Sequence, residues 1–443
     1  MLRKTRIMIA MLLAVLMCVT TIAPLIALAE EPENQDGVVF AKDEENPAEA
    51  GITKKLRLPI GTTIPSVKFI FEMTGISIDE DTSRGKDAPI PHEDDLTISF
   101  SEADRNIMTG PEEGIFTIRK ETLDIFGKVK FDSAGVYVYE ITERADNNEA
   151  IDESKDEWLY YSKAKYILNV YVANKEGDNN ETYIYAIGTK FNIKDDGTPA
   201  GDHKVDATPG GGEDFEYSQM IFVNDYVMLN GPDKPDNPDP VNYASLLTSK
   251  TVTGIYGDLE AFFKFDITLT TPIILDPKEV PTYFKGYVVE GDKIVTGTKN
   301  APDSETEEDA LGRYIKVNPN GTTTFHLKHG QRLVLMDTPV GTRYHVIEHG
   351  VQHYHASVIV TTNGVGATEI KAERAGDNLS TGPQHTSEIR NSAAFTNDRN
   401  FVAPTGLNMK DLPFFILIAL GLGILVAFVG AKVYLGHRKH LSR

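Results

Sequence analysis

Two stretches of the chain carry the same four segments in the same order, and this internal repeat most constrains the possible fold. The first segment of each stretch carries a lysine (GITKKLRL and SLLTSKTVTG), and an aromatic segment follows (VKFIFEM and AFFKFDITL). A segment ending in glutamate comes next (GVYVYEITE and GTRYHVIE), and a phenylalanine segment with asparagine closes each stretch (MIFVND and AAFTND). The repeated polar residues are Lys54, Glu143 and Asn224 in the first stretch, and Lys250, Glu348 and Asn397 in the second. The repeat predicts two domains of one kind.

Both stretches have the sequence character of β-structure. Short runs rich in Val, Ile, Phe and Tyr alternate with Gly, Asp, Asn and Pro clusters, and no long run between the termini shows helical periodicity. The strands predicted in the first stretch are Ile52–Leu58, Val67–Met73, Leu96–Phe100, Gly114–Ile118, Gly135–Glu143, Lys165–Ala173, Thr182–Thr189 and Gln219–Val227. Strands at this spacing favour an all-β protein of two tandem immunoglobulin-like β-sandwich domains.

Composition places the boundaries of these domains. A polar segment, residues 30–49, is expected to be disordered and to precede a first domain at residues 50–229. Residues 230–240 contain four prolines among polar residues, which is typical of an extended interdomain linker. The second domain is then expected at residues 241–400.

The repeated polar residues fall on the apolar side of their strands. Side chains two residues apart share one face of a strand, so Lys54 shares a face with Ile52 and Leu56, and Glu143 with Tyr139 and Ile141. The same parity holds for the other four residues. An unpaired buried lysine or glutamate costs several kcal/mol, so two domains with the same three buried polar groups require a chemical reason.

Isopeptide bond formation supplies such a reason. Burial lowers the pKa of a lysine and raises that of a glutamate, giving a neutral amine and a neutral acid. The acid can polarise an asparagine amide, the amine can attack the amide carbon, and ammonia leaves. This chemistry predicts Lys54–Asn224 and Lys250–Asn397 cross-links assisted by Glu143 and Glu348. The alternative is that all six are structural residues held by salt bridges and turns.

The N-terminus has the pattern of a secretory signal peptide. Three basic residues precede an apolar core at about residues 7–26, and Ala27-Leu28-Ala29 offers a cleavage site that places residues 1–29 in the signal peptide. The only cysteine, Cys18, lies within this segment. The exported portion is therefore expected to fold without disulfides.

A second membrane-related signal stands at the C-terminus. Residues 401–406 contain Val402-Ala403-Pro404-Thr405-Gly406, which resembles a sortase cleavage signal. An apolar segment, about Leu412 to Leu435, and a basic tail complete residues 407–443 as a transmembrane helix and cytoplasmic end. In this interpretation a sortase thiol attacks the Thr405 carbonyl and releases Gly406. The alternative is an ordinary single-pass anchor.

Charge and motifs exclude several other functions. The net charge is −21, and both terminal segments are basic, so the exported portion is more acidic still. This charge argues against nucleic acid or anionic lipid as a partner, and limits membrane contact to the C-terminal helix of the precursor. His345 and His349 match the H-x-x-E-H pattern of zinc peptidases, but that pattern needs a helix. No metal, cofactor or enzymatic activity is expected.

The quoted segments resemble the major pilins of Gram-positive bacteria of the streptococcal T-antigen type. The resemblance covers nearly all of the exported portion. It implies Lys–Asn bonds with the same residue roles, sortase joining of Thr405 to a neighbouring subunit, and a place in the bacterial cell wall. Expected partners are a sortase, neighbouring pilin subunits or peptidoglycan, and a host surface ligand.

The chain also departs from that family. The region before Asn224 reads GGGEDFEYSQM and lacks the lysine that accepts the next subunit in those pilins. The expected function is therefore a pilin subunit that supports adhesion, with a wall-anchored adhesin or stalk that never polymerises as the alternative.

Overall fold

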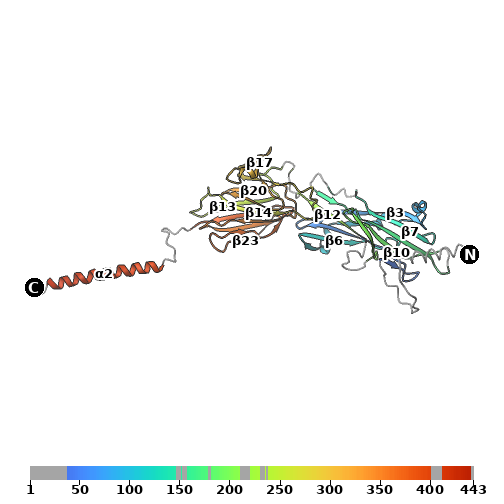
Figure 1. The fold of residues 1–443 in the computed structure, drawn as a ribbon, viewed down its shortest axis with the longest axis horizontal. Helices are drawn as coiled ribbons and strands as arrows, with labels where there is room; N and C mark the ends of the chain where they lie inside the picture. Colours follow the sequence, from blue (N-terminus) through green and yellow to red (C-terminus); the bar gives the residue numbers. More distant parts are fainter. Residues whose placement is uncertain are drawn as a thin grey trace.

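The computed structural model describes residues 37–145, 151, 157–177, 181–209, 220–229, 235, 238–400 and 412–440. Two β-sandwiches follow one another along the long axis of the molecule (Figure 1). The C-terminal segment forms one long helix, α2 (Leu412–His440). The prediction of an all-β fold with two tandem sandwiches and an apolar C-terminal helix is confirmed.

The first sandwich consists of two sheets. One has the strand order β1-β10-β9-β7-β3-β4, with β11 beside β10, and the other the order β5-β6-β2-β12-β8. The strands of the first sheet are β1 (Val38–Phe40), β3 (Val67–Ile78), β4 (Thr97–Phe100), β7 (Gly135–Glu143), β9 (Lys165–Asn174), β10 (Thr182–Ile193) and β11 (Pro199–Val205). The strands of the second are β2 (Ile52–Pro59), β5 (Thr109–Glu112), β6 (Ile115–Glu121), β8 (Glu157–Tyr160) and β12 (Met220–Met228). Every strand predicted in this stretch is present, with its ends shifted by a few residues.

The second sandwich has the same two-sheet construction. Its larger sheet has the order β17-β18-β15-β20-β13-β26-β22-β23, with β16 beside β15, and its smaller sheet the order β19-β14-β21-β24, with β25 beside β21. The strands are β13 (Leu246–Thr253), β14 (Phe263–Thr270), β15 (Phe284–Glu290), β16 (Lys293–Ile294), β17 (Thr306–Glu308), β18 (Arg313–Val317), β19 (Thr322–Leu327), β20 (Gln331–Leu335), β21 (Arg343–Glu348), β22 (His355–Thr362), β23 (Val365–Lys371), β24 (Leu379–Ser380), β25 (Gln384–His385) and β26 (Asn391–Asp398). Short 3-10 helices connect some strands: η1 (Thr82–Asp87), η2 (Glu93–Leu96), η3 (Glu102–Ile107) and η5 (Asp303–Glu305).

The first and last long strands of each sandwich are neighbours and run parallel. β2 pairs with β12, and β13 pairs with β26. All other ladders between the described strands are antiparallel. Parallel neighbours cannot be joined by a tight hairpin, so each pair is brought together only when the whole domain between its strands has folded.

Alternating side chains from the two sheets of each sandwich form its core. β9 alternates between buried and half-buried positions along almost its whole length, and β13 shows the same period of two. One apolar cluster fills the first sandwich, and a second fills the other. Two facing apolar layers of this kind are what a sandwich requires.

The start of the described chain differs from the prediction of disorder over residues 30–49. Val38–Phe40 forms β1, which pairs with β10. Val39 and Ala41 are buried against the core. A three-residue strand is too short to show a period of two, which is why the sequence did not indicate it.

The two sandwiches contact each other directly. The Val340 N–H donates to the carbonyl of Met228 at 2.9 Å, and the Glu388 carboxylate accepts from the Thr63 hydroxyl at 2.8 Å. An apolar cluster spans the junction, with Ile115 and Val227 from the first sandwich and Ile274 and Leu275 from the second. The two sandwiches therefore meet through both polar and apolar contacts.

Helix α2 is long and apolar enough to cross a membrane. Its window Ile416–Val433 has a mean hydropathy of 2.5 and is exposed throughout. A bilayer core needs about 20 apolar residues in a helix, so length and composition agree with the predicted anchor. The signal peptide and the sortase-signal residues Val402, Pro404, Thr405 and Gly406 lie outside the described residues.

Candidate cross-link sites

In the first sandwich, lysine and asparagine side chains are placed together by adjacent parallel strands. Lys54 on β2 lies opposite Phe222 on β12, and Asn224 follows two residues later on the same face. Both side chains are fully buried. The lysine points into the core because its neighbours of equal parity, Ile52 and Leu56, also belong to the core.

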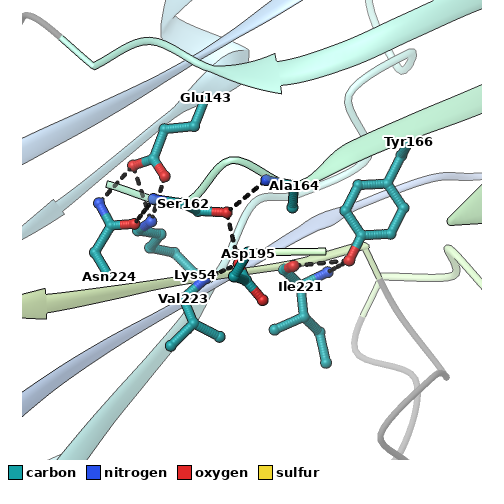
Figure 2. A network of polar contacts seen from close by, with 9 residues as sticks. All are labelled: Lys54, Glu143, Ser162, Ala164, Tyr166, Asp195, Ile221, Val223 and Asn224. Carbon is teal, nitrogen blue, oxygen red and sulfur yellow. Dashed lines mark hydrogen bonds and ion pairs between the residues drawn. The ribbon is translucent and has the colours of Figure 1, made fainter. Parts of the chain in front are cut away.

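The facing sheet supplies the acid. Glu143 ends β7 and lies opposite Phe71 of β3. Its Oε1 accepts from Lys54 Nζ at 2.8 Å and from Asn224 Nδ2 at 2.8 Å, and its Oε2 accepts from Lys54 Nζ at 2.8 Å. One carboxylate thus contacts both the amine and the amide (Figure 2).

Aromatic rings enclose this site. Lys54 Nζ lies 4.5 Å from the centroid of the Phe69 ring, and Phe71 packs on Phe222 with ring centroids 4.8 Å apart. Tyr166 also packs on Phe222, with ring centroids 5.2 Å apart. The rings exclude water, while the ring face still favours a nearby cation.

The second sandwich repeats the arrangement. Lys250 on β13 lies opposite Phe395 on β26, and Asn397 follows two residues later. Lys250 Nζ donates to Glu348 Oε1 at 2.6 Å, and Asn397 Nδ2 donates to the same oxygen at 2.7 Å. Glu348 ends β21 opposite Phe265 of β14.

The aromatic enclosure also recurs in the second sandwich. Lys250 Nζ lies 4.3 Å from the centroid of the Phe263 ring, and Phe265 packs on Phe395 at 5.2 Å. Phe263 precedes the strand partner of its glutamate by two residues, as Phe69 does in the first sandwich. The two sites are therefore equivalent in their strand arrangement, their register and their aromatic surroundings, as well as in the three polar residue types.

In both lysine–glutamate pairs, burial shifts the pKa values in the direction that favours the neutral forms. It lowers the pKa of Lys54 and of Lys250 to about 8, and the neighbouring glutamate opposes this shift in each site. Burial also raises the pKa of Glu143 and of Glu348, against the opposing effect of the lysine and the asparagine amide. Transfer of one proton within each pair would give an uncharged amine beside an uncharged acid.

The segment between β8 and β9, which belongs to no strand, distinguishes the first site from the second. The Ser162 backbone N–H donates to Asn224 Oδ1 at 2.7 Å, and the Ser162 hydroxyl donates to Asp195 at 2.5 Å. In the described part of the second sandwich, Asn397 Oδ1 and Glu348 Oε2 are buried without a hydrogen-bond partner. No sequence signal marked Ser162 or Asp195 as part of the site.

The two histidines of the H-x-x-E-H pattern lie away from this chemistry. His345 lies on β21, where its Nε2 is 2.5 Å from the Ser380 hydroxyl, and His349 directly follows β21, with its Nε2 2.7 Å from Asp266. Glu348 points to the opposite, buried face. No cluster of three or more potential metal ligands occurs among the residues that the structure describes.

Comparison with known proteins gives distant similarities. The model of DUF7601, a domain of unknown function, matches residues 244–399. A curated protein named pilin from Streptococcus pyogenes serotype M1 is 23% identical over 399 residues, covering 89% of this chain and 92% of that protein.

Solved structures of pilins are also matched. The major pilin of Streptococcus pyogenes is 18% identical, with 80% of this chain and all of that chain covered and a TM-score of 0.29. A second major pilin of the same species, T3.2, is 18% identical, with 82% of this chain and all of that chain covered and a TM-score of 0.28.

Proposed function

We propose that the protein is a pilin-type structural subunit of a bacterial surface whose two sandwiches are each closed by a self-formed Lys–Asn isopeptide bond. The bonds join Lys54 to Asn224 and Lys250 to Asn397, and Glu143 and Glu348 promote them. One observation carries the proposal: in both sandwiches the amine and the amide nitrogen hydrogen-bond to the same buried carboxylate oxygen, at 2.6–2.8 Å.

The reaction needs no external reagent. Proton transfer from the lysine ammonium to the glutamate carboxylate gives a neutral amine and a neutral acid. The amine nitrogen attacks Cγ of the asparagine, the acid protonates Nδ2, and the C–N bond to that nitrogen breaks. The new amide nitrogen returns a proton to the carboxylate, and ammonia leaves. The lysine ammonium and the asparagine amide are converted to one substituted amide and one ammonia, and the ammonia takes the remaining proton as ammonium, which restores the glutamate carboxylate.

The position of the bonds suits a structural subunit. Each bond would join the first long strand of a sandwich to the last, since β2 neighbours β12 and β13 neighbours β26. Tension entering through one terminal strand would pass to the other through covalent bonds rather than through the hydrogen bonds of the sheet. In the chain-entropy model developed for disulfides, a cross-link that closes a loop of this length stabilises a fold by about 5 kcal/mol.

The C-terminus supports attachment to the cell surface. The sequence Val402-Ala403-Pro404-Thr405-Gly406 precedes α2, whose apolar window could hold the precursor in the membrane. We infer that a sortase cleaves after Thr405 and joins it to a neighbouring subunit or to peptidoglycan. The similarity to a streptococcal pilin over most of both chains supports this assignment.

The intact mass of recombinant residues 30–405 tests the cross-links. We expect a deficit of two ammonia molecules, with peptides that map to Lys54–Asn224 and Lys250–Asn397. A mass equal to that of the sequence would overturn the isopeptide assignment.

Denaturing gels of protein from the native cell wall test polymerisation. A ladder of high-mass species is expected, and a single wall-linked species would instead identify an anchored adhesin or stalk.

A further inference from the structure

The Asn224 amide is held in one orientation by a backbone group. The Ser162 N–H can only donate, so Asn224 must turn its oxygen towards it, at 2.7 Å, and its nitrogen towards Glu143. Figure 2 shows the amide between these two partners. In this orientation the carboxyl contacts the nitrogen that would leave, and the backbone N–H contacts the oxygen on which negative charge would develop.

A network around Asp195 holds Ser162 in place. Asp195 Oδ1 accepts from the Ser162 hydroxyl at 2.5 Å and from the Val223 N–H at 2.8 Å. The Ser162 hydroxyl in turn accepts from the Ala164 N–H at 3.1 Å. Val223 immediately precedes Asn224. The Asp195 carboxylate therefore holds both Ser162, whose N–H is the donor, and the strand that carries Asn224, whose Oδ1 is the acceptor (Figure 2).

We propose that the Ser162 backbone N–H is an oxyanion donor for cross-linking in the first sandwich, an inference that rests on the proposed isopeptide chemistry. Attack of the Lys54 amine on Cγ of Asn224 moves an electron pair onto Oδ1, where the N–H stabilises it. Glu143 then protonates Nδ2, the electron pair on Oδ1 reforms the carbonyl as ammonia leaves, and the new amide nitrogen returns its extra proton to Glu143. Asp195 is a positioning residue that acts through Ser162. A preorganised donor of this kind is worth about 100- to 1,000-fold in rate.

Strand pairing explains why the described part of the second site lacks this donor. β22 continues alongside β26 past the asparagine, with Ala356 opposite Asn397 and His355 opposite Asp398. In the first sandwich the ladder between β8 and β12 reaches only Tyr160, opposite Asp225. The chain after β8 therefore leaves the ladder, and it turns its Ser162 N–H towards the asparagine.

An amide-to-ester replacement tests the donor itself. Residues 30–405 are made by cell-free synthesis with the native Ser162 and with glyceric acid, the α-hydroxy analogue of serine, at position 162, which keeps the side-chain hydroxyl bonded to Asp195 and replaces the N–H by an ester oxygen. Samples are quenched with acid over time and both bonds are quantified by mass spectrometry. We expect the ester to slow the Lys54–Asn224 bond about 100-fold or more. The Lys250–Asn397 bond should form at the same rate in both chains, as an internal control.

The outcomes separate the inference from the function it rests on. Equal rates in the ester and amide chains would overturn the role of Ser162 alone, whereas an unmodified chain that never loses ammonia would overturn the cross-links as well. Asn224→Ala versions of both chains report folding, because neither can form the bond. If the ester chain does not fold, NMR of a Lys54→Met chain replaces it. There, a Ser162 amide proton that does not shift on Asn224→Ala would overturn the inference.

Discussion

Asn224 lies two residues beyond the strand partner of Lys54, on the parallel strand beside it, and both side chains face the same core. Asn397 has the same offset from Lys250 in the second sandwich. A one-residue slip of either strand would turn every side chain to the other face. The register of the sheet therefore decides whether the amine and the amide can meet.

The glutamates are expected to be required for bond formation. Glu143→Gln keeps the size and much of the hydrogen bonding of the side chain but cannot exchange the proton that the reaction needs. We expect this variant to fold and to lose one ammonia instead of two, with the Lys250–Asn397 bond intact. Glu348→Gln should show the converse. Peptide mapping of the intact protein measures both results, and a Lys54–Asn224 bond in Glu143→Gln would contradict the role of Glu143.

Loss of either bond should lower thermal stability in its own sandwich. Asn224→Ala and Asn397→Ala each remove one cross-link, worth about 5 kcal/mol in the chain-entropy model. For domains of this size about 1 kcal/mol corresponds to about 2–4 °C, so each transition should fall by roughly 10–20 °C in calorimetry. The matched controls are conservative changes at half-buried neighbours on the same strands, Ile221→Val and Thr396→Ser, which leave the amides in place. Melting unchanged by Asn224→Ala would show that the bond contributes no stability.

The rate of bond formation should depend on pH with a maximum. At low pH each pair holds two protons and the lysine remains an ammonium ion, which cannot attack. One proton must leave for the amine to become neutral while the glutamate keeps the acid proton. Above about pH 8, where burial places the pKa of Lys54 and Lys250, the last proton leaves and the leaving nitrogen has no acid. The rate of bond formation should therefore fall on both the acidic and the basic side of its maximum.

This profile can be measured during cell-free synthesis in buffers of different pH, with acid quenching and mass spectrometry. A rate that keeps rising well above pH 8 would indicate that the free amine alone suffices and that the glutamate does not act as an acid.

The sequence predicted the fold class and the residues of both sites because strand period and the internal repeat are local signals. Lys54 and Leu56 share a face whatever the tertiary structure, and the same order of segments occurs around Lys250. The pairing of β2 with β12 could be inferred only from the chemistry assigned to its residues. The structure adds the register of that pairing, which sets Phe222 opposite Lys54 and so places Asn224 two residues beyond the lysine's partner.

Ser162 and Asp195 could not be found from the sequence for a physical reason. Ser162 contacts Asn224 through its backbone N–H, a group that every residue except proline carries. Asp195 is 33 residues away from it in the chain. Neither a residue type nor a spacing marks such a contact. β1 was not predicted for a related reason. Val38–Phe40 is held as a strand by its pairing with β10 and is too short to show a hydrophobic period in the sequence.

The junction between the sandwiches should control the stiffness of the molecule independently of the cross-links. Leu275 is buried in the apolar cluster that spans the junction, together with Ile115 and Val227 of the first sandwich. Leu275→Asp would place a charge among these side chains, which is unfavourable without a partner. We therefore expect the two sandwiches to separate and reorient. Leu275→Met, which conserves volume and polarity, should leave the junction closed.

Small-angle X-ray scattering of residues 30–405 measures this effect as a broader distribution of distances in Leu275→Asp than in Leu275→Met. Both isopeptide bonds should still form in both variants, because each site is built from strands of a single sandwich. Identical scattering from the two variants would mean that the backbone bond from Val340 to Met228 and the contact between Thr63 and Glu388 hold the junction without the apolar cluster. Loss of a cross-link in Leu275→Asp would show instead that the sandwiches do not fold independently.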